Sequence, residues 1–284
     1  MLLGRLPRAA LPRPAASLAS VVVLCLVART THAAQCGDCW CVPDDAAGLC
    51  PEWRPANYTG AELAAWARQR PTNPFALDCD PYADAACATA PAQSALVGAD
   101  GAVCALAYDG RGARGCASYA MASFASAADA TARGASVTHE GACGACSTTQ
   151  DLAAYVAHPD LASAGKACAA KALLSEAWAR ACYEALGFSE ACAALWVYDG
   201  RKDSEACARA CVGELRAPNN GPPPACALND CLQCDEDEAG PVFKAVAGRT
   251  RRRSGLESAI ARPCSTVAQI VHEVCPSDDS YVDS

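Results

Sequence analysis

Cysteine content constrains this chain more than any other feature, because 21 of its 284 residues are cysteine. In an exported protein such a density predicts a disulfide framework, in which each bridge contributes ~2–4 kcal/mol. The chain needs this support, since only 34 of the 250 residues from Gln35 onward are Leu, Ile, Val or Phe. That share lies below the ~20% at which a chain is suspected of lacking a sufficient core. We therefore expect the reduced protein to unfold.

A cleavable signal peptide is predicted at residues 1–34. Three arginines precede an apolar run from Leu18 to Ala28, and small residues follow at Ala33 and Ala34. The run is shorter than the ~20 residues that a membrane-spanning helix needs. Cleavage would remove Cys25 and leave 20 cysteines, the even number that full pairing requires. We expect a secreted protein, or one in the lumen of the secretory pathway.

The charge of the chain argues against two classes of partner. Its net charge is −8, and the signal peptide holds four arginines and no acid, so the mature chain would carry −12. Such a chain repels nucleic-acid phosphates and anionic lipids. We therefore expect no nucleic-acid partner and no stable membrane insertion after signal cleavage. No phosphate loop or other cofactor motif is present, so no cofactor is predicted.

Changes in composition divide the mature chain into six predicted segments. They are a cysteine-rich irregular N-terminal segment (35–100), a small α/β element (101–158), a helical segment (159–217), a proline-rich linker (218–224), a helical segment with cysteines (225–275) and an acidic tail (276–284). Cysteines lie on both sides of the linker. We therefore expect one disulfide-linked body rather than independent domains.

Two sequence periods indicate the fold class. Residues 103–108 and 116–124 form two strand-like runs on either side of the turn residues 109–112 and predict a β-hairpin, and residues 135–139 predict a third strand. Beyond residue 159 the apolar residues recur at helical spacing. The predicted fold class is α+β, mostly α: a disulfide-rich helical body with a small β-hairpin or sheet.

The sequence also predicts which tryptophans of the helical part are buried and where its last two helices lie. Trp178 and Trp196 lie at helical spacing from cysteines and are predicted to belong to the core. A helix is predicted over residues 256–262. A last helix, carrying His272, is predicted to end at Cys275.

All twenty mature cysteines are disulfide candidates. They are Cys36, Cys39, Cys41, Cys50, Cys79, Cys87, Cys104, Cys116, Cys143, Cys146, Cys168, Cys182, Cys192, Cys207, Cys211, Cys226, Cys231, Cys234, Cys264 and Cys275. Twenty cysteines allow on the order of 10⁸–10⁹ pairings, so the connectivity stays open.

The motif Cys143-Gly-Ala-Cys146 is the stretch that comes nearest to chemistry. Ser147 and Gln150 fit a capping box, which places both sulfurs at a helix start. A helix N-terminus lowers the pKa of a thiol, so the motif fits a redox pair in which Cys143 attacks, Cys146 resolves and His139 activates. It fits two structural disulfide anchors equally well. A zinc site formed with Cys231 and Cys234 is a third alternative.

Several long motifs resemble a known group of proteins. They are CWCVP (Cys39 to Pro43), VTHEGACGAC (Val137 to Cys146) with the residues up to Tyr155, CDEDEAGPVFK (Cys234 to Lys244) and AGRTRR (Ala247 to Arg252). These runs are similar to uncharacterised cysteine-rich secreted proteins of unicellular algae and related protists. The resemblance implies a shared fold and export, but it assigns no activity and no catalytic residue.

Three polar features complete the set of candidates. Asn57 begins the sequon Asn-Tyr-Thr and is a predicted glycosylation site. The acidic run Asp235 to Glu238 is interpreted as solvated charge, since it lacks the alternating ligands of a calcium loop. For the cluster Arg249 to Arg253 three interpretations stay open, in this order: a solvated surface, an internal partner of the acidic run, and a protease processing site.

The leading hypothesis for function is a non-enzymatic extracellular or cell-surface module with a binding or structural role. The alternative is an exported thiol–disulfide oxidoreductase that uses Cys143 and Cys146. No metal ligand is predicted.

Overall fold

The computed structural model describes residues 39–44, 48–88, 96–109, 116–172, 174–214 and 217–273. These residues belong to one compact unit. The signal peptide, Cys36, Cys275 and the acidic tail predicted from the sequence lie outside the described residues. Within them the fold is α+β and mostly helical, which confirms the predicted fold class.

A small mixed sheet has the strand order β1-β3-β2-β4. Strands β2 (Val103–Tyr108) and β3 (Ser118–Phe124) form the antiparallel hairpin, β4 (Ser136–Glu140) pairs antiparallel with β2, and β1 (Arg70–Pro71) adds two parallel residues to β3. All three strands predicted from the sequence are therefore present. Helix α4 (Ala127–Ala132) covers the sheet, where Ala130 packs beside Phe124.

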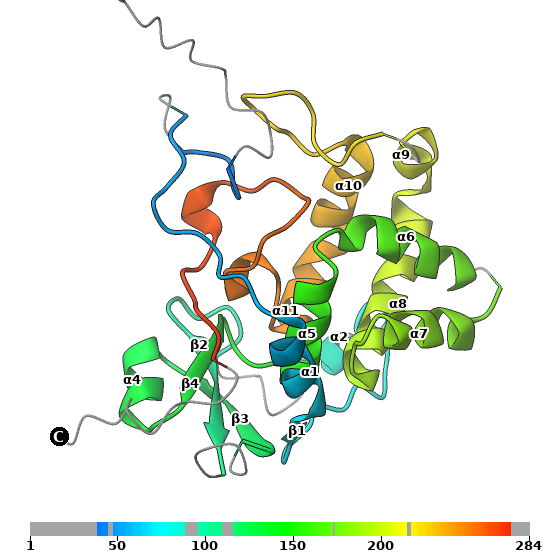
Figure 1. Cartoon of the computed structure of the whole chain (residues 1–284). Coiled ribbons are helices and arrows are strands. Elements are labelled where there is room, and N and C mark those ends of the chain that lie inside the picture. Colours follow the sequence, from blue (N-terminus) through cyan, green and yellow to red (C-terminus); the bar gives the residue numbers. More distant parts are fainter. Residues whose placement is uncertain are drawn as a thin grey trace, which may run out of the picture. The chain divides into compact units, whose positions relative to one another are not determined.

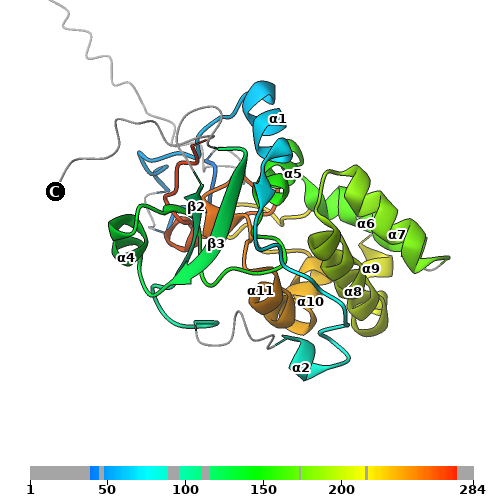
Figure 2. The ribbon, with the colours of Figure 1, turned by 90° about the horizontal axis from the view of Figure 1, so that it is seen from below.

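The helical part surrounds α5 (Thr149–Ala157), which is buried over most of its length. Figure 1 shows α5 and α11 (Gly240–Ala247) between the sheet and the remaining helices. Those are α6 (Leu161–Ala172), α7 (Glu176–Ala185), α8 (Glu190–Ala206), α9 (Ala208–Gly213) and α10 (Asp230–Glu238). Figure 2 shows α1 (Gly60–Arg68) beside α5, and the short α2 (Ala85–Ala88) near α10 and α11. The core between these helices is mostly alanine and aromatic, as the low content of aliphatic residues requires.

Eight disulfides have both cysteines placed among the described residues, with sequence separations from 8 to 223 residues. They are Cys39–Cys50, Cys41–Cys264, Cys79–Cys87, Cys104–Cys143, Cys146–Cys192, Cys168–Cys182, Cys207–Cys234 and Cys211–Cys231. Cys116 and Cys226 are also disulfide-bonded. The segment predicted as a proline-rich linker is held in place too, because the Asn220 side chain bonds the backbone of Ala259 and Ala261.

Four local predictions are wrong. The N-cap of α5 is Thr148, paired in a capping box with Asp151, rather than Ser147. Residues 256–262 and the stretch around His272 are not helical. Trp178 is 62% exposed, because it lies on the outer face of α7 instead of in the core.

Candidate ligand-binding pocket

The Cys-Gly-Ala-Cys motif fastens the sheet to the helices. Cys143 bonds to Cys104 of β2, whereas Cys146 bonds to Cys192 of α8. The motif backbone lies against the end of α11, with Ala145 N donating to Val246 O at 2.8 Å. A Cβ at Gly144 would come within 2.3 Å of the same oxygen, so only glycine fits there.

This pairing removes the basis of the redox hypothesis, which needs Cys143 and Cys146 bonded to each other. His139 does not activate a thiol either, since its Nε2 lies 2.7 Å from Ser147 Oγ and both residues are fully buried. Burial and the charge of Arg249 lower the pKa of His139 well below its ordinary value, which keeps the imidazole neutral. The zinc alternative fails because Cys231 and Cys234 are in disulfides as well.

Arg249 lies at the centre of the molecule rather than on a solvated surface. Its guanidinium is fully buried and donates to the carbonyls of Thr138, Cys146 and Ser147 and to the hydroxyls of Thr138 and Ser254. Burial lowers its pKa to about 10, so the group stays charged at neutral pH. The first interpretation of the arginine cluster is therefore wrong for this residue.

A pocket of about 180 Å³ lies beyond this network. Its walls come from α5, α6, α8, α10, α11, the 250–267 stretch and Trp40 near the N-terminus. The apolar part of the lining consists chiefly of Leu161, Leu232, Phe243, Leu256, Ile260 and Val267. An aromatic and aliphatic lining with a few polar groups is typical of small-molecule sites.

Three polar atoms in this lining are buried and make no hydrogen bond with the described residues. They are Nε1 of Trp40, Nε1 of Trp196 and the hydroxyl of Tyr155. Tyr155 is 2% exposed, and burial raises the pKa of its phenol. The Trp196 indole acts in the opposite direction on that pKa, but the two groups do not reach hydrogen-bond geometry. Because buried polar groups are normally paired, three orphans in one pocket indicate a missing partner.

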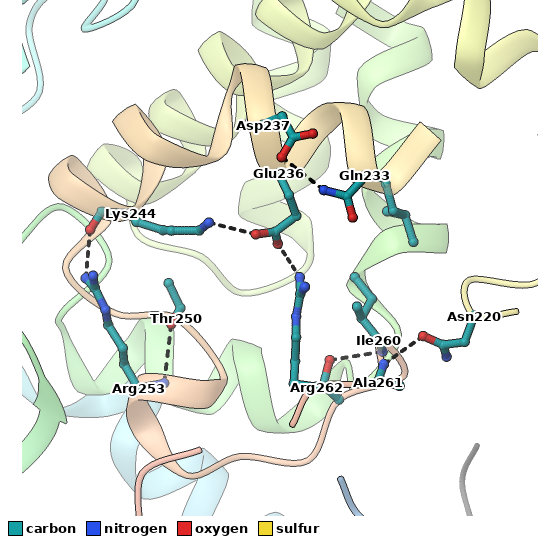
Figure 3. A network of polar contacts seen from close by, with 12 residues as sticks. Asn220, Gln233, Glu236, Asp237, Lys244, Thr250, Arg253, Ile260, Ala261 and Arg262 are labelled. Atoms are coloured by element: carbon teal, nitrogen blue, oxygen red, sulfur yellow. Dashed lines mark hydrogen bonds and ion pairs between the residues drawn. The ribbon is translucent and has the colours of Figure 1, made fainter. Parts of the chain in front are cut away.

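The charged groups of the pocket differ in whether they have partners. Glu236 lies between Lys244, at 2.7 Å, and Arg262 (Figure 3). Arg251 donates to the carbonyls of Glu257 and His158 and lies 5.5 Å over the Tyr155 ring. Glu236 of the acidic run therefore forms its ion pairs with Lys244 and Arg262. Of the arginine cluster, Arg252 acts on Glu236 through its charge, which agrees with the second interpretation of the cluster for this residue.

Arg252 differs from these neighbours. Within the part of the chain that the structure describes, its guanidinium makes no hydrogen bond or ion pair, although it lines the pocket. It is half-buried. The Arg252 guanidinium is therefore available to form a hydrogen-bonded ion pair with a ligand.

Three carboxylates form a cluster at one side of the pocket. Asp199 and Asp203 lie one turn apart on α8, Asp235 lies on α10, and an oxygen of each falls within 4.8 Å of the others. The disulfide Cys207–Cys234 joins the C-cap of α8 to α10, and Cys211–Cys231 joins the following helix α9 to α10, despite this crowding of acids. Three oxygens are a donor set that Ca²⁺ or Mg²⁺ accepts.

Burial dominates the protonation of this cluster. It raises the pKa of Asp199 to about 7 and that of Asp235 to about 9, and the neighbouring carboxylates add to both shifts. Asp199 also accepts a hydrogen bond of 2.6 Å from the Tyr82 hydroxyl. The interpretation of Asp235 as solvated charge is therefore wrong.

Asp235→Asn should stabilise the protein more at pH 8 than at pH 5. The raised pKa means that the folded chain keeps a proton that the unfolded chain releases above pH ~4, so stability falls as pH rises toward about 9. Asparagine cannot ionise and removes this loss. We expect a relative gain of at least ~3 °C in Tm at pH 8, measured by calorimetry. Asp237→Asn, which replaces an exposed residue of the same helix, should show no such pH dependence. If the melting temperatures of both variants changed equally with pH, the raised pKa of Asp235 would be refuted.

The pocket was not visible in the sequence. Of its polar groups the sequence singled out the acidic run and the arginines, but it gave no sign that Trp40, Tyr155 and Trp196 meet. Asn57 lies on an exposed stretch before α1, and Thr59 of the same sequon is the N-cap of that helix. Glycosylation of Asn57 stays a prediction.

Comparison with known proteins gives one match. No curated protein and no solved structure matches the chain. Most walls of the pocket lie within residues 176–270, whereas Trp40 and α5 lie outside this range. Residues 176–270 match the family model described as a family of unknown function, DUF8771.

Proposed function

We propose that this chain is a secreted, non-enzymatic module that binds a small ligand in the pocket between α5, α8, α10 and α11. The observation that carries the proposal is the group of three buried polar atoms without partners in one mostly apolar cavity. Leaving such atoms unpaired costs ~1–3 kcal/mol each. A bound ligand that pairs with them recovers this free energy.

Two further observations support the location and the absence of catalysis. The dense disulfides fit a protein that folds in an oxidising compartment. Among the described residues, the pair that resembles a nucleophile and base, Ser147 with His139, is fully buried and out of reach of a substrate.

The test is calorimetric titration with 2-naphthamide, a neutral two-ring probe. Ala162 lines the pocket from α6, so Ala162→Trp should fill it and weaken binding by at least about tenfold, or ~1.4 kcal/mol. Ala167→Trp, on an exposed position of the same helix, should leave affinity within about twofold of the unmodified protein. Absence of binding, or equal loss in both variants, would overturn the proposal.

A further inference from the structure

The three polar groups of the pocket without hydrogen bonds in the described part of the chain can all donate one. An indole Nε1–H donates only and never accepts, so Trp40 needs an acceptor from the ligand, whereas Trp196 already interacts with the Tyr155 hydroxyl without reaching hydrogen-bond geometry. Tyr155 is only 2% exposed. Its hydroxyl makes no hydrogen bond with the described residues, so it can donate one to the ligand as well. A ligand that satisfies these groups must carry oxygen acceptors.

Arg252 adds a positive charge to this set of donors. Its guanidinium makes no hydrogen bond or ion pair with the residues that the structure describes, although its charge helps to lower the pKa of Glu236. Lys244 and Arg262, in contrast, both form ion pairs with Glu236 (Figure 3). A guanidinium is planar and binds the two oxygens of a carboxylate side by side. The unpaired cation therefore favours an anionic head group.

The acidic side chains in the same pocket do not cancel this preference. Glu236 is neutralised by two cations. Burial raises the pKa of Asp199 to about 7 and of Asp235 to about 9, so Asp235 is largely protonated and neutral at physiological pH. Asp160 and part of the Asp199 population remain ionised. Four cations line the same pocket, Lys244, Arg251, Arg252 and Arg262, so the balance of charge that faces a ligand is positive.

Size limits the rest of the ligand. The pocket of about 180 Å³ is close to a ~150 Å³ cavity that binds benzene. Its apolar walls, which include Leu232 and Phe243, suit a body of one or two rings.

Taking the proposed pocket function as given, we infer that the ligand is a small aromatic carboxylate whose head group binds Arg252 and the Tyr155 hydroxyl. The rings of the ligand occupy the apolar walls, and the indole N–H groups of Trp40 and Trp196 donate to the remaining oxygen lone pairs. This assigns a chemical class to the ligand and a specificity role to Arg252.

The experiment compares 2-naphthoate with the neutral 2-naphthamide, which has the same rings. The full-length protein should bind 2-naphthoate at least about tenfold more tightly by calorimetry. Arg252→Gln should abolish this preference and leave the affinity for 2-naphthamide within about twofold. Arg209→Gln, which removes an exposed arginine outside the pocket lining, should change neither affinity.

Tyr155→Phe gives a second measurement that does not depend on Arg252. It should weaken binding of 2-naphthoate while the melting temperature without ligand stays equal or rises, because the lost hydroxyl has no partner in the apo protein. A lower melting temperature with unchanged affinity would mean a purely structural role and overturn the assignment of Tyr155.

The outcomes separate the two proposals. Equal binding of both probes, insensitive to Arg252→Gln, would overturn the carboxylate assignment and leave the pocket function standing. Failure of both probes to bind would overturn the pocket function, and the ligand class with it.

Discussion

Arg249→Met should lower the free energy of unfolding by at least ~4 kcal/mol, the largest loss expected from any single substitution in this chain. The guanidinium supplies five hydrogen bonds, three of them to the buried carbonyls of Thr138, Cys146 and Ser147. Methionine fills much of the volume but donates nothing, and each orphaned buried acceptor costs ~1–3 kcal/mol. Urea unfolding followed by tryptophan fluorescence measures the change.

The control for Arg249 is Arg133→Met. Arg133 pairs with Asp129 on the surface of the sheet side of the molecule, where its side chain is 68% exposed. An exposed ion pair of this kind contributes ~0–1 kcal/mol. Arg249→Lys should fall between the two, since a lysine retains the charge but lacks the planar set of five donors. If Arg249→Met unfolded at the same urea concentration as Arg133→Met, the buried network would not stabilise the fold as argued.

Replacing both Cys146 and Cys192 with serine should cost roughly 4 kcal/mol. The bridge closes a sequence separation of 46 residues, and the entropy of an unfolded loop of that length gives this magnitude. Both sulfurs are fully buried, so the two serine hydroxyls add a desolvation penalty. Chemical unfolding and the yield of secreted protein measure the loss.

The matched comparison is the double serine variant of Cys79 and Cys87, whose separation is 8 residues. By loop length alone it should lose only roughly 2–3 kcal/mol. Equal losses in the two variants would argue that loop closure is not what the Cys146–Cys192 bridge provides. A variant of Cys146 and Cys192 with unchanged stability would contradict the structural role of the motif itself.

The elements that depend on local sequence were predictable. Two apolar, β-prone runs, 103–108 and the strand before Phe124, identified the hairpin because turn residues separate them. The N-cap of α5 was missed for a specific reason: the sequence Ser147-Thr148-Thr149-Gln150-Asp151 allows two overlapping capping boxes. The Ser147 hydroxyl is taken by His139 and by the amide of Gly144, and this tertiary contact leaves Thr148 as the cap.

The features that depend on distant segments were not predictable. A run of arginines is most often solvated, and the partners that bury Arg249 come from positions more than 100 residues earlier. Trp178 and Trp196 occupy similar helical patterns, yet one is exposed and the other lines the pocket. Asp199 and Asp203 are recognisable as one turn apart, but Asp235 joins them through the tertiary packing of α10 against α8, which the sequence does not reveal.

The bridge between Cys41 and Cys264 has a consequence for biosynthesis. Its two cysteines are 223 residues apart, and ribosomes add ~5–20 residues per second. In the secretory route proposed above, Cys41 would enter the oxidising compartment ~10–45 s before its partner has been made, while Cys39 and Cys50, 11 residues apart, would meet almost at once. During this interval the free thiol of Cys41 can attack completed bridges nearby and form wrong disulfide pairings. Correct maturation thus calls for thiol–disulfide exchange after the last cysteines emerge, and so for an isomerase in the producing cell.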